Sequence, residues 1–257
     1  THKTFTHNFG DMFKIEQFFG AGGVYPKRWW HFSQADTLLD PDINRILLDK
    51  DVPRVPQSLF NAANIKYLLT ENYLPMEKNF NLVYDKDIKI YENKTVFPRA
   101  YMRFSTFTAN GMESAKETFY ENPTFNENFD VVIEEADNIH LEDKKKEGKA
   151  SITITNYQEN KVELKVLNNK KGILILADSF YAGWKALVDN KEVKIYPVNV
   201  MFRGLIIDEG EHEVKFTYQP AWFVPTMTIS LISIIVCLTM MLWTKFPFIY
   251  NIIKSKL

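Results

Sequence analysis

VPTMTISLISIIVCLTMMLW, at Val224–Trp243, is the stretch that decides the fold of this chain. It lies inside a longer stretch, Phe216–Thr244, that contains no charged residue. About 20 apolar residues are enough for a helix to cross the hydrocarbon core of a bilayer. The alternative is a buried helix of a large soluble protein, but the rest of the chain is too small to surround it. The sequence therefore predicts a transmembrane helix over residues 221–244, followed by a tail at 245–257.

The residues on either side of this helix indicate its orientation. Aromatic residues, which favour the membrane–water interface, occur at both ends of the apolar stretch: Tyr218, Trp222 and Phe223 at its start, and Trp243, Phe246, Phe248 and Tyr250 at its end. Acidic residues precede the helix (Asp208, Glu209, Glu211 and Glu213), whereas lysines follow it (Lys245, Lys254 and Lys256). Because positive charge favours the cytoplasmic side, we expect a cell-membrane protein with a cytoplasmic tail and an extracytoplasmic main domain.

The composition excludes several classes of function. Lys and Arg number 31 against 32 for Asp and Glu, so no strongly basic surface favours nucleic acid. The single cysteine, Cys237, lies in the apolar stretch and provides no disulfide framework. The histidines have no metal-ligand spacing, and we predict no metal and no cofactor. The chain begins at Thr1 without a signal peptide, and an exported domain without an export signal predicts further sequence upstream.

Residues 149–220 are predicted to form an antiparallel β-sandwich portion. Alternating apolar and polar residues predict strands, and a continuous apolar run predicts a central strand buried on both faces. The alternating segments are 151–155, 162–166 and 213–218, and the apolar run is 172–177. Turn residues separate them at 168–169, 189–190 and 208–210.

Residues 81–148 are predicted to form an α+β region. A hairpin joins strands at 82–84 and 88–91. Asn110, with Glu113 three residues later, resembles a capping box that opens a helix with Met112, Ala115 and Phe119 on one face. A strand at 131–133 follows, and the charged run 142–148 is expected to be a solvated loop.

Residues 1–80 are predicted to be an irregular α/β segment. It contains expected helices at 40–48 and 58–64, a strand at 65–69, and a glycine-rich turn at 20–23 without the context of a phosphate-binding loop. The fold class is thus mixed α/β and all-β: a sandwich-like domain, preceded by an α+β region and followed by one transmembrane helix.

A family resemblance is carried by several stretches of the chain. They are Ala177–Val193, Val200–Leu205 and Gly210–Pro220, and earlier Leu59–Leu69, Tyr91–Asn93 and Pro98–Ala100. In order and spacing these stretches resemble the C-terminal end of the YfhO-type bacterial membrane proteins, across roughly Val24–Trp243.

This resemblance implies a polytopic protein with a glycosyltransferase-C-like membrane body. Such proteins are linked to the transfer of a sugar from a polyprenyl-phosphate donor to a cell-envelope polymer, so the expected partners are the lipid bilayer, that donor and an envelope glycan acceptor. The family's catalytic carboxylate lies in an early extracytoplasmic loop, to which nothing here corresponds. We therefore predict no catalytic residue in this chain. The alternative is a non-catalytic structural or carbohydrate-binding module.

One candidate contact site lies near the N-terminus. Lys27 and Arg28 lie beside Trp29 and Trp30, and this group of basic and aromatic residues could bind a lipid phosphate at the membrane interface. The same residue types would serve a domain that only rests on the bilayer.

The other candidates lie in the predicted sandwich. Tyr181 and Trp184 could stack on a sugar ring, although large aromatic residues also lock sheets together in sandwich cores. Arg203 could bind a phosphate through two hydrogen bonds, or form a structural hydrogen bond at the start of a strand.

Overall fold

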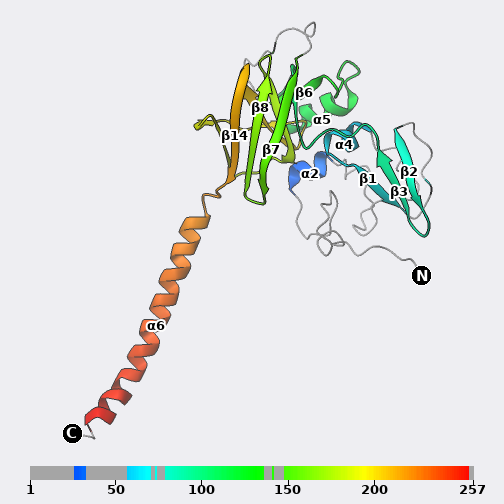
Figure 1. The fold of residues 1–257 in the computed structure, drawn as a ribbon. Helices are drawn as coiled ribbons and strands as arrows, with labels where there is room; N and C mark the ends of the chain where they lie inside the picture. Colours follow the sequence, from blue (N-terminus) through cyan, green and yellow to red (C-terminus); the bar gives the residue numbers. More distant parts are fainter. Residues whose placement is uncertain are drawn as a thin grey trace.

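The structure is a computed structural model that describes residues 26–32, 57–70, 73, 79–135, 141 and 148–254. The helix predicted at 40–48, the turn at 20–23 and nearly all of the charged loop at 142–148 lie outside these residues. The predicted fold class is confirmed, because strands in three sheets make up most of the regular structure and one long apolar helix follows them (Figure 1).

The described elements follow one another along the chain. They are α2 (Lys27–Phe32), α4 (Gln57–Ala62), β1 (Tyr67–Thr70), β2 (Phe80–Asp85), β3 (Lys89–Asn93), β4 (Ala100–Arg103), β5 (Ser105–Ala109), α5 (Met112–Glu121), β6 (Asp130–Glu134), β7 (Ala150–Gln158), β8 (Lys161–Asn168), β9 (Gly172–Ser179), β10 (Trp184–Val188), β11 (Lys191–Val193), β12 (Tyr196–Val198), β13 (Phe202–Ile207), β14 (Gly210–Tyr218) and α6 (Phe223–Lys254).

Two sheets pack face to face as a sandwich. The five-stranded sheet has the order β11-β10-β14-β8-β7, and the six-stranded sheet has the order β4-β9-β13-β12-β6-β5. Leu174, Leu176 and Leu205 of the larger sheet pack against Leu164 and Phe216 of the smaller one. As predicted from its continuous apolar run, β9 is a central strand, and its first five residues are buried.

The other face of the six-stranded sheet carries a second apolar core. Helices α2, α4 and α5 contribute to it, as do β1 and β3 of the small sheet ordered β1-β3-β2. Phe32 of α2 is fully buried there and meets the ring of Phe202 at 4.8 Å. The six-stranded sheet is therefore a middle layer that combines strands from both sides of residue 149.

The pairing among strands of residues 149–220 is antiparallel, as predicted. In the α+β region, β5 and β6 run parallel and are joined through α5. Parallel strands need such a crossover connection. The predicted capping box is wrong: the N-cap of α5 is Gly111, with φ 86°, and no side chain caps the helix. Because glycine has no Cβ, it adopts this backbone conformation without a steric penalty.

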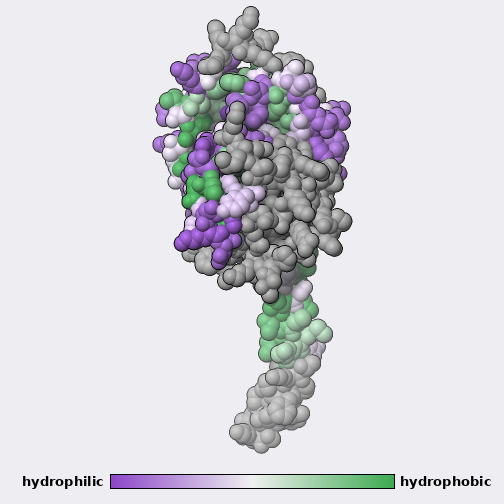
Figure 2. All heavy atoms as spheres, turned by 90° about the vertical axis from the view of Figure 1, so that its right-hand side faces the viewer, coloured by the Kyte–Doolittle hydropathy of each residue, from purple (hydrophilic) through white to green (hydrophobic). Residues whose placement is uncertain are grey.

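Helix α6 has the properties expected of a membrane-spanning segment. Its segment Phe223–Trp243 has a mean hydropathy of 2.1, and this apolar segment is not buried against the rest of the described protein. Figure 2 shows this part as a green surface that projects from the domain. The helix begins two residues after the predicted start and continues to Lys254, past the predicted end at residue 244.

Candidate functional site

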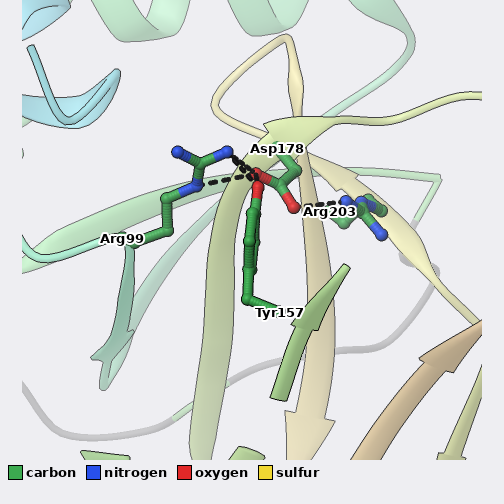
Figure 3. A network of polar contacts seen from close by, with 4 residues as sticks. All are labelled: Arg99, Tyr157, Asp178 and Arg203. Carbon is green, nitrogen blue, oxygen red and sulfur yellow. Dashed lines mark hydrogen bonds and ion pairs between the residues drawn. The ribbon is translucent and has the colours of Figure 1, made fainter. Parts of the chain in front are cut away.

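Four polar residues meet at the end of the sandwich that is nearest to α6. We call Arg99, Tyr157, Asp178 and Arg203 the arginine cluster (Figure 3). Tyr157 lies near the end of β7, Asp178 near the end of β9 and Arg203 near the start of β13, while Arg99 directly precedes β4. Antiparallel pairing brings these strand ends together.

The Asp178 carboxylate holds the cluster together by bridging two guanidinium groups. Arg99 Nε donates to Asp178 Oδ1 at 2.9 Å, and Arg203 Nη2 donates to Oδ2 at 2.6 Å. The Tyr157 hydroxyl donates to Oδ1 at 3.1 Å and accepts a hydrogen bond from Arg99 Nη2. Because Tyr157 belongs to one sheet and Asp178 to the other, this network ties the two sheets together.

Arg203 is an internal residue of this cluster, with only 2% of its surface exposed. Its guanidinium carbon lies 3.8 Å from the centre of the Trp184 ring and 5.2 Å from that of Phe216. Burial lowers the pKa of Arg203 to about 10, and the Asp178 carboxylate acts against this shift. The arginine is therefore still charged at neutral pH and depends on Asp178 as its counter-ion.

The two aromatic candidates have different environments. Trp184 is the first residue of β10, and its ring lies 5.4 Å from that of Tyr218, with Arg203 over its face. Tyr181 lies in the loop between β9 and β10 and is 54% exposed. Of the two rings, that of Tyr181 is the more accessible for contact with a ligand or a lipid.

Arg28 forms a second polar contact beside this loop. Its guanidinium makes a two-pronged ion pair with Glu134, at 2.6 and 2.9 Å, and donates to the carbonyl oxygen of Val200 at 2.7 Å. Its guanidinium carbon also lies 5.1 Å from the centre of the Phe180 ring. The side chain of Glu134 is almost fully buried, so this pair fixes α2 to the six-stranded sheet.

The other members of the N-terminal candidate site are not equivalent. Lys27 is exposed, whereas Trp29 is 7% exposed and belongs to the second core. The side chain of Trp30 lies outside the described part of the structure. The structure thus brings Arg28 close to the Phe180–Gly183 loop and leaves Lys27 open to the solvent.

Replacing Arg28 with Met is expected to lower the free energy of unfolding by about 3 kcal/mol, because it leaves the buried Glu134 carboxylate without its partner. Lys27→Met is the matched control and should cost less than about 0.5 kcal/mol, since that side chain is exposed. Denaturant unfolding of the chain in detergent measures both values. Equal effects of the two substitutions would show that the ion pair contributes nothing.

The sequence prediction missed Arg99, Tyr157, Asp178 and Glu134. Asp178 and Glu134 carried a weak signal, since each is an acidic residue at the end of an apolar strand segment. Such a residue must find a partner when the strand is buried. Their partners lie 79, 25 and 106 positions away along the chain, so no local pattern indicated the pairing.

The site is suited to ionic and aromatic contacts. In the described residues, no group of three or more His, Cys, Asp and Glu side chains is arranged to hold a metal ion. The charges of the arginine cluster are one carboxylate and two guanidinium groups, which leaves the cluster itself with one excess positive charge.

A β-rich domain joined directly to an exposed apolar helix of spanning length defines a membrane protein with a folded domain outside the bilayer. Residues 118–230, from within α5 to the first turns of α6, match the family described as bacterial membrane protein YfhO. The match confirms the resemblance for the stretches Ala177–Val193, Val200–Leu205 and Gly210–Pro220, so this part of the chain is similar to the YfhO-type proteins. The earlier stretches lie outside the matched residues. A comparison with curated proteins and with solved structures finds no match.

Proposed function

We propose that this chain is the C-terminal extracytoplasmic domain and last membrane helix of a polytopic envelope glycosyltransferase. The enzyme would move a sugar from a polyprenyl-phosphate donor to a cell-envelope polymer. The domain would position the acceptor or cover the active site, and the catalytic carboxylate would belong to a part of the protein outside residues 1–257.

The observation that carries this proposal is the short connection between the domain and the membrane helix. β14 ends at Tyr218 and α6 begins at Phe223, so one end of the sandwich is held next to the start of the apolar span. The phosphate of a lipid-linked donor lies at the same depth, at the surface of the bilayer. The family match supports the membrane setting, and the acidic residues before α6 and the lysines after it support an extracytoplasmic domain.

A deletion of the full gene tests the proposal. We expect the mutant cells to lose the sugar modification of an envelope polymer and to regain it with the intact gene. A gene in which residues 81–220 are replaced by a flexible linker should be inserted in the membrane but fail to restore the modification. Normal envelope glycosylation in the deletion strain would overturn the proposal, and full restoration by the linker version would show that the domain is dispensable.

The second candidate function is a structural or carbohydrate-binding module without transferase activity. It is favoured by the internal use of Arg203 and Trp184, whose contacts are those of a packed sandwich. Binding of envelope glycans to the detergent-solubilised chain, with unchanged envelope glycosylation in the deletion strain, would support this alternative.

A further inference from the structure

The loop Phe180–Gly183 is fastened to the connection between the sandwich and α6. The backbone N–H of Gln219 donates to the carbonyl oxygen of Gly183 at 2.6 Å. Gly183 has φ 103°, and a Cβ atom there would lie 3.0 Å from the Tyr218 ring and 3.1 Å from Pro220 Cα. The close approach leaves no room for a side chain, so the loop lies against the connection itself.

Contacts on both sides of this junction restrict its movement. Trp184, directly after the loop, packs against Tyr218, the last residue of β14. On the other side, the N–H of Phe223 donates to the Pro220 carbonyl oxygen at 3.0 Å, which joins the connection to the start of α6. The loop is therefore held at the level where α6 begins.

The exposed residues at this level are suited to a membrane interface. Tyr181 is 54% exposed, Trp222 63% and Phe223 54%. Tyrosine and tryptophan are enriched at the headgroup level because their rings have both apolar and polar parts. Tyr181 is separated from the other two along the chain by the whole of β10–β14, so it adds an independent contact.

An exposed lysine also lies at the helix-proximal end of the five-stranded sheet. Lys185 is there the cross-strand neighbour of Thr217. Lys161, the other cross-strand neighbour of Thr217, already pairs with Glu163 at 2.8 Å, so Lys185 is the lysine of this pair that we assign to the membrane contact.

The opposite end of β14, about 27 Å away, carries Asp208, Glu209 and Glu211. On α2, Lys27 adds an exposed cation near the Phe180–Gly183 loop, because its neighbour Arg28 contacts Phe180. Lys27 and Lys185 thus lie towards the bilayer end of the domain, whereas the far end carries charges of both signs, since Asp208 there pairs with Lys171 at 2.9 Å.

We propose that Tyr181, with Lys185 and Lys27 beside it, docks on the headgroups of a bilayer that contains anionic phospholipid. The sandwich is then held at two points, by α6 and by this loop, and stands in one orientation on the membrane. A basic residue near an anionic surface contributes about 1 kcal/mol to membrane binding. Because α6 already holds the domain next to the bilayer, the two lysines and the tyrosine are together sufficient to keep the loop on the surface. This inference goes beyond the proposed function and does not depend on sugar transfer.

A spin label at residue 181 tests the docking in the complete chain. Cys237 is the only cysteine, so Tyr181→Cys is made together with Cys237→Ser and reconstituted in phosphatidylglycerol vesicles. The accessibility of the label to oxygen and to a water-soluble nickel chelate gives its depth. Labels at Ile234→Cys, in the apolar span, and at Leu167→Cys, which is exposed at the far end of β8, provide the deep and aqueous references.

We expect the oxygen-to-nickel accessibility ratio at residue 181 to lie between the two references. A ratio equal to that at residue 167 overturns the proposal. Lys185→Glu should move the ratio at 181 towards the aqueous value in phosphatidylglycerol vesicles but not in phosphatidylcholine vesicles. Lys191→Glu, on the same hairpin but farther from α6, is the matched control and should have the smaller effect. Equal effects of the two reversals, or no effect of Lys185→Glu, overturn the role of the lysines.

Discussion

Asp178→Asn is expected to destabilise the domain by about 3–5 kcal/mol, because it removes the counter-ion of a buried arginine. The amide retains the shape of the carboxylate but not its charge. Arg203, with 3% of its side chain exposed, would then remain charged among Trp184 and Phe216 with Arg99 close by. The substitution therefore combines an unpaired buried charge with the repulsion of two cations.

Removing the arginine instead should cost far less. In Arg203→Met the Asp178 carboxylate keeps Arg99 and the Tyr157 hydroxyl as partners. Methionine has a similar length and fills the space under Trp184, so we expect a loss of at most about 2 kcal/mol. The burial that lowers the pKa of Arg203 to about 10 shows that the desolvation of this residue is only partly offset by Asp178.

The double variant Asp178→Asn with Arg203→Met separates the two contributions. Once the buried cation is absent, the loss of the carboxylate should cost little, so the double variant should be more stable than Asp178→Asn alone. Denaturant unfolding in detergent, followed by near-ultraviolet circular dichroism, gives the three free energies. Similar losses for the two single variants would contradict the assignment of Asp178 as the required counter-ion.

The elements that the sequence predicted correctly are those with a strong local pattern. β7, β8 and β14 alternate, β9 is continuously apolar, and the apolar span of α6 has no charged residue. The hairpin of β10 and β11 was indicated only by its turn, Asp189-Asn190, in which both residues have positive φ. Asparagine and aspartate tolerate this conformation better than most residues, which is why the turn was visible in the sequence.

The parts that the sequence did not predict depend on contacts between distant segments. The parallel pair β5–β6 was missed because β5 has no alternating apolar pattern, and its strand is defined by its neighbour in the sheet. The arginine cluster was missed for the same reason. A single Arg203 in the sequence indicates an anion, but only the fold shows that this anion is Asp178 from the adjacent strand.

Two lysines in the middle of α6 are expected to abolish its insertion into a bilayer. A lysine at the centre of a transmembrane helix raises the free energy of insertion by about 2.5–3.5 kcal/mol. Loss of the apolar residue that it replaces adds a further fraction of about 1 kcal/mol. Ile234→Lys with Leu238→Lys should therefore raise the free energy of insertion by about 6–8 kcal/mol. No part of the described domain covers this span, so the domain offers no alternative burial for the apolar residues that remain.

Flotation of the reconstituted chain with vesicles in a density gradient measures this effect. The unaltered chain should float with the lipid after washing at high pH, whereas the double lysine variant should remain at the bottom. Ile234→Ala with Leu238→Ala tests the loss of side-chain volume alone and should still float. Trp243→Lys places a single lysine at the end of the apolar span, where the long side chain can reach water, and this variant should also float. If the central lysines leave flotation unchanged, α6 does not cross the bilayer. The short connection from β14 would then no longer place the arginine cluster and Tyr181 at a membrane surface.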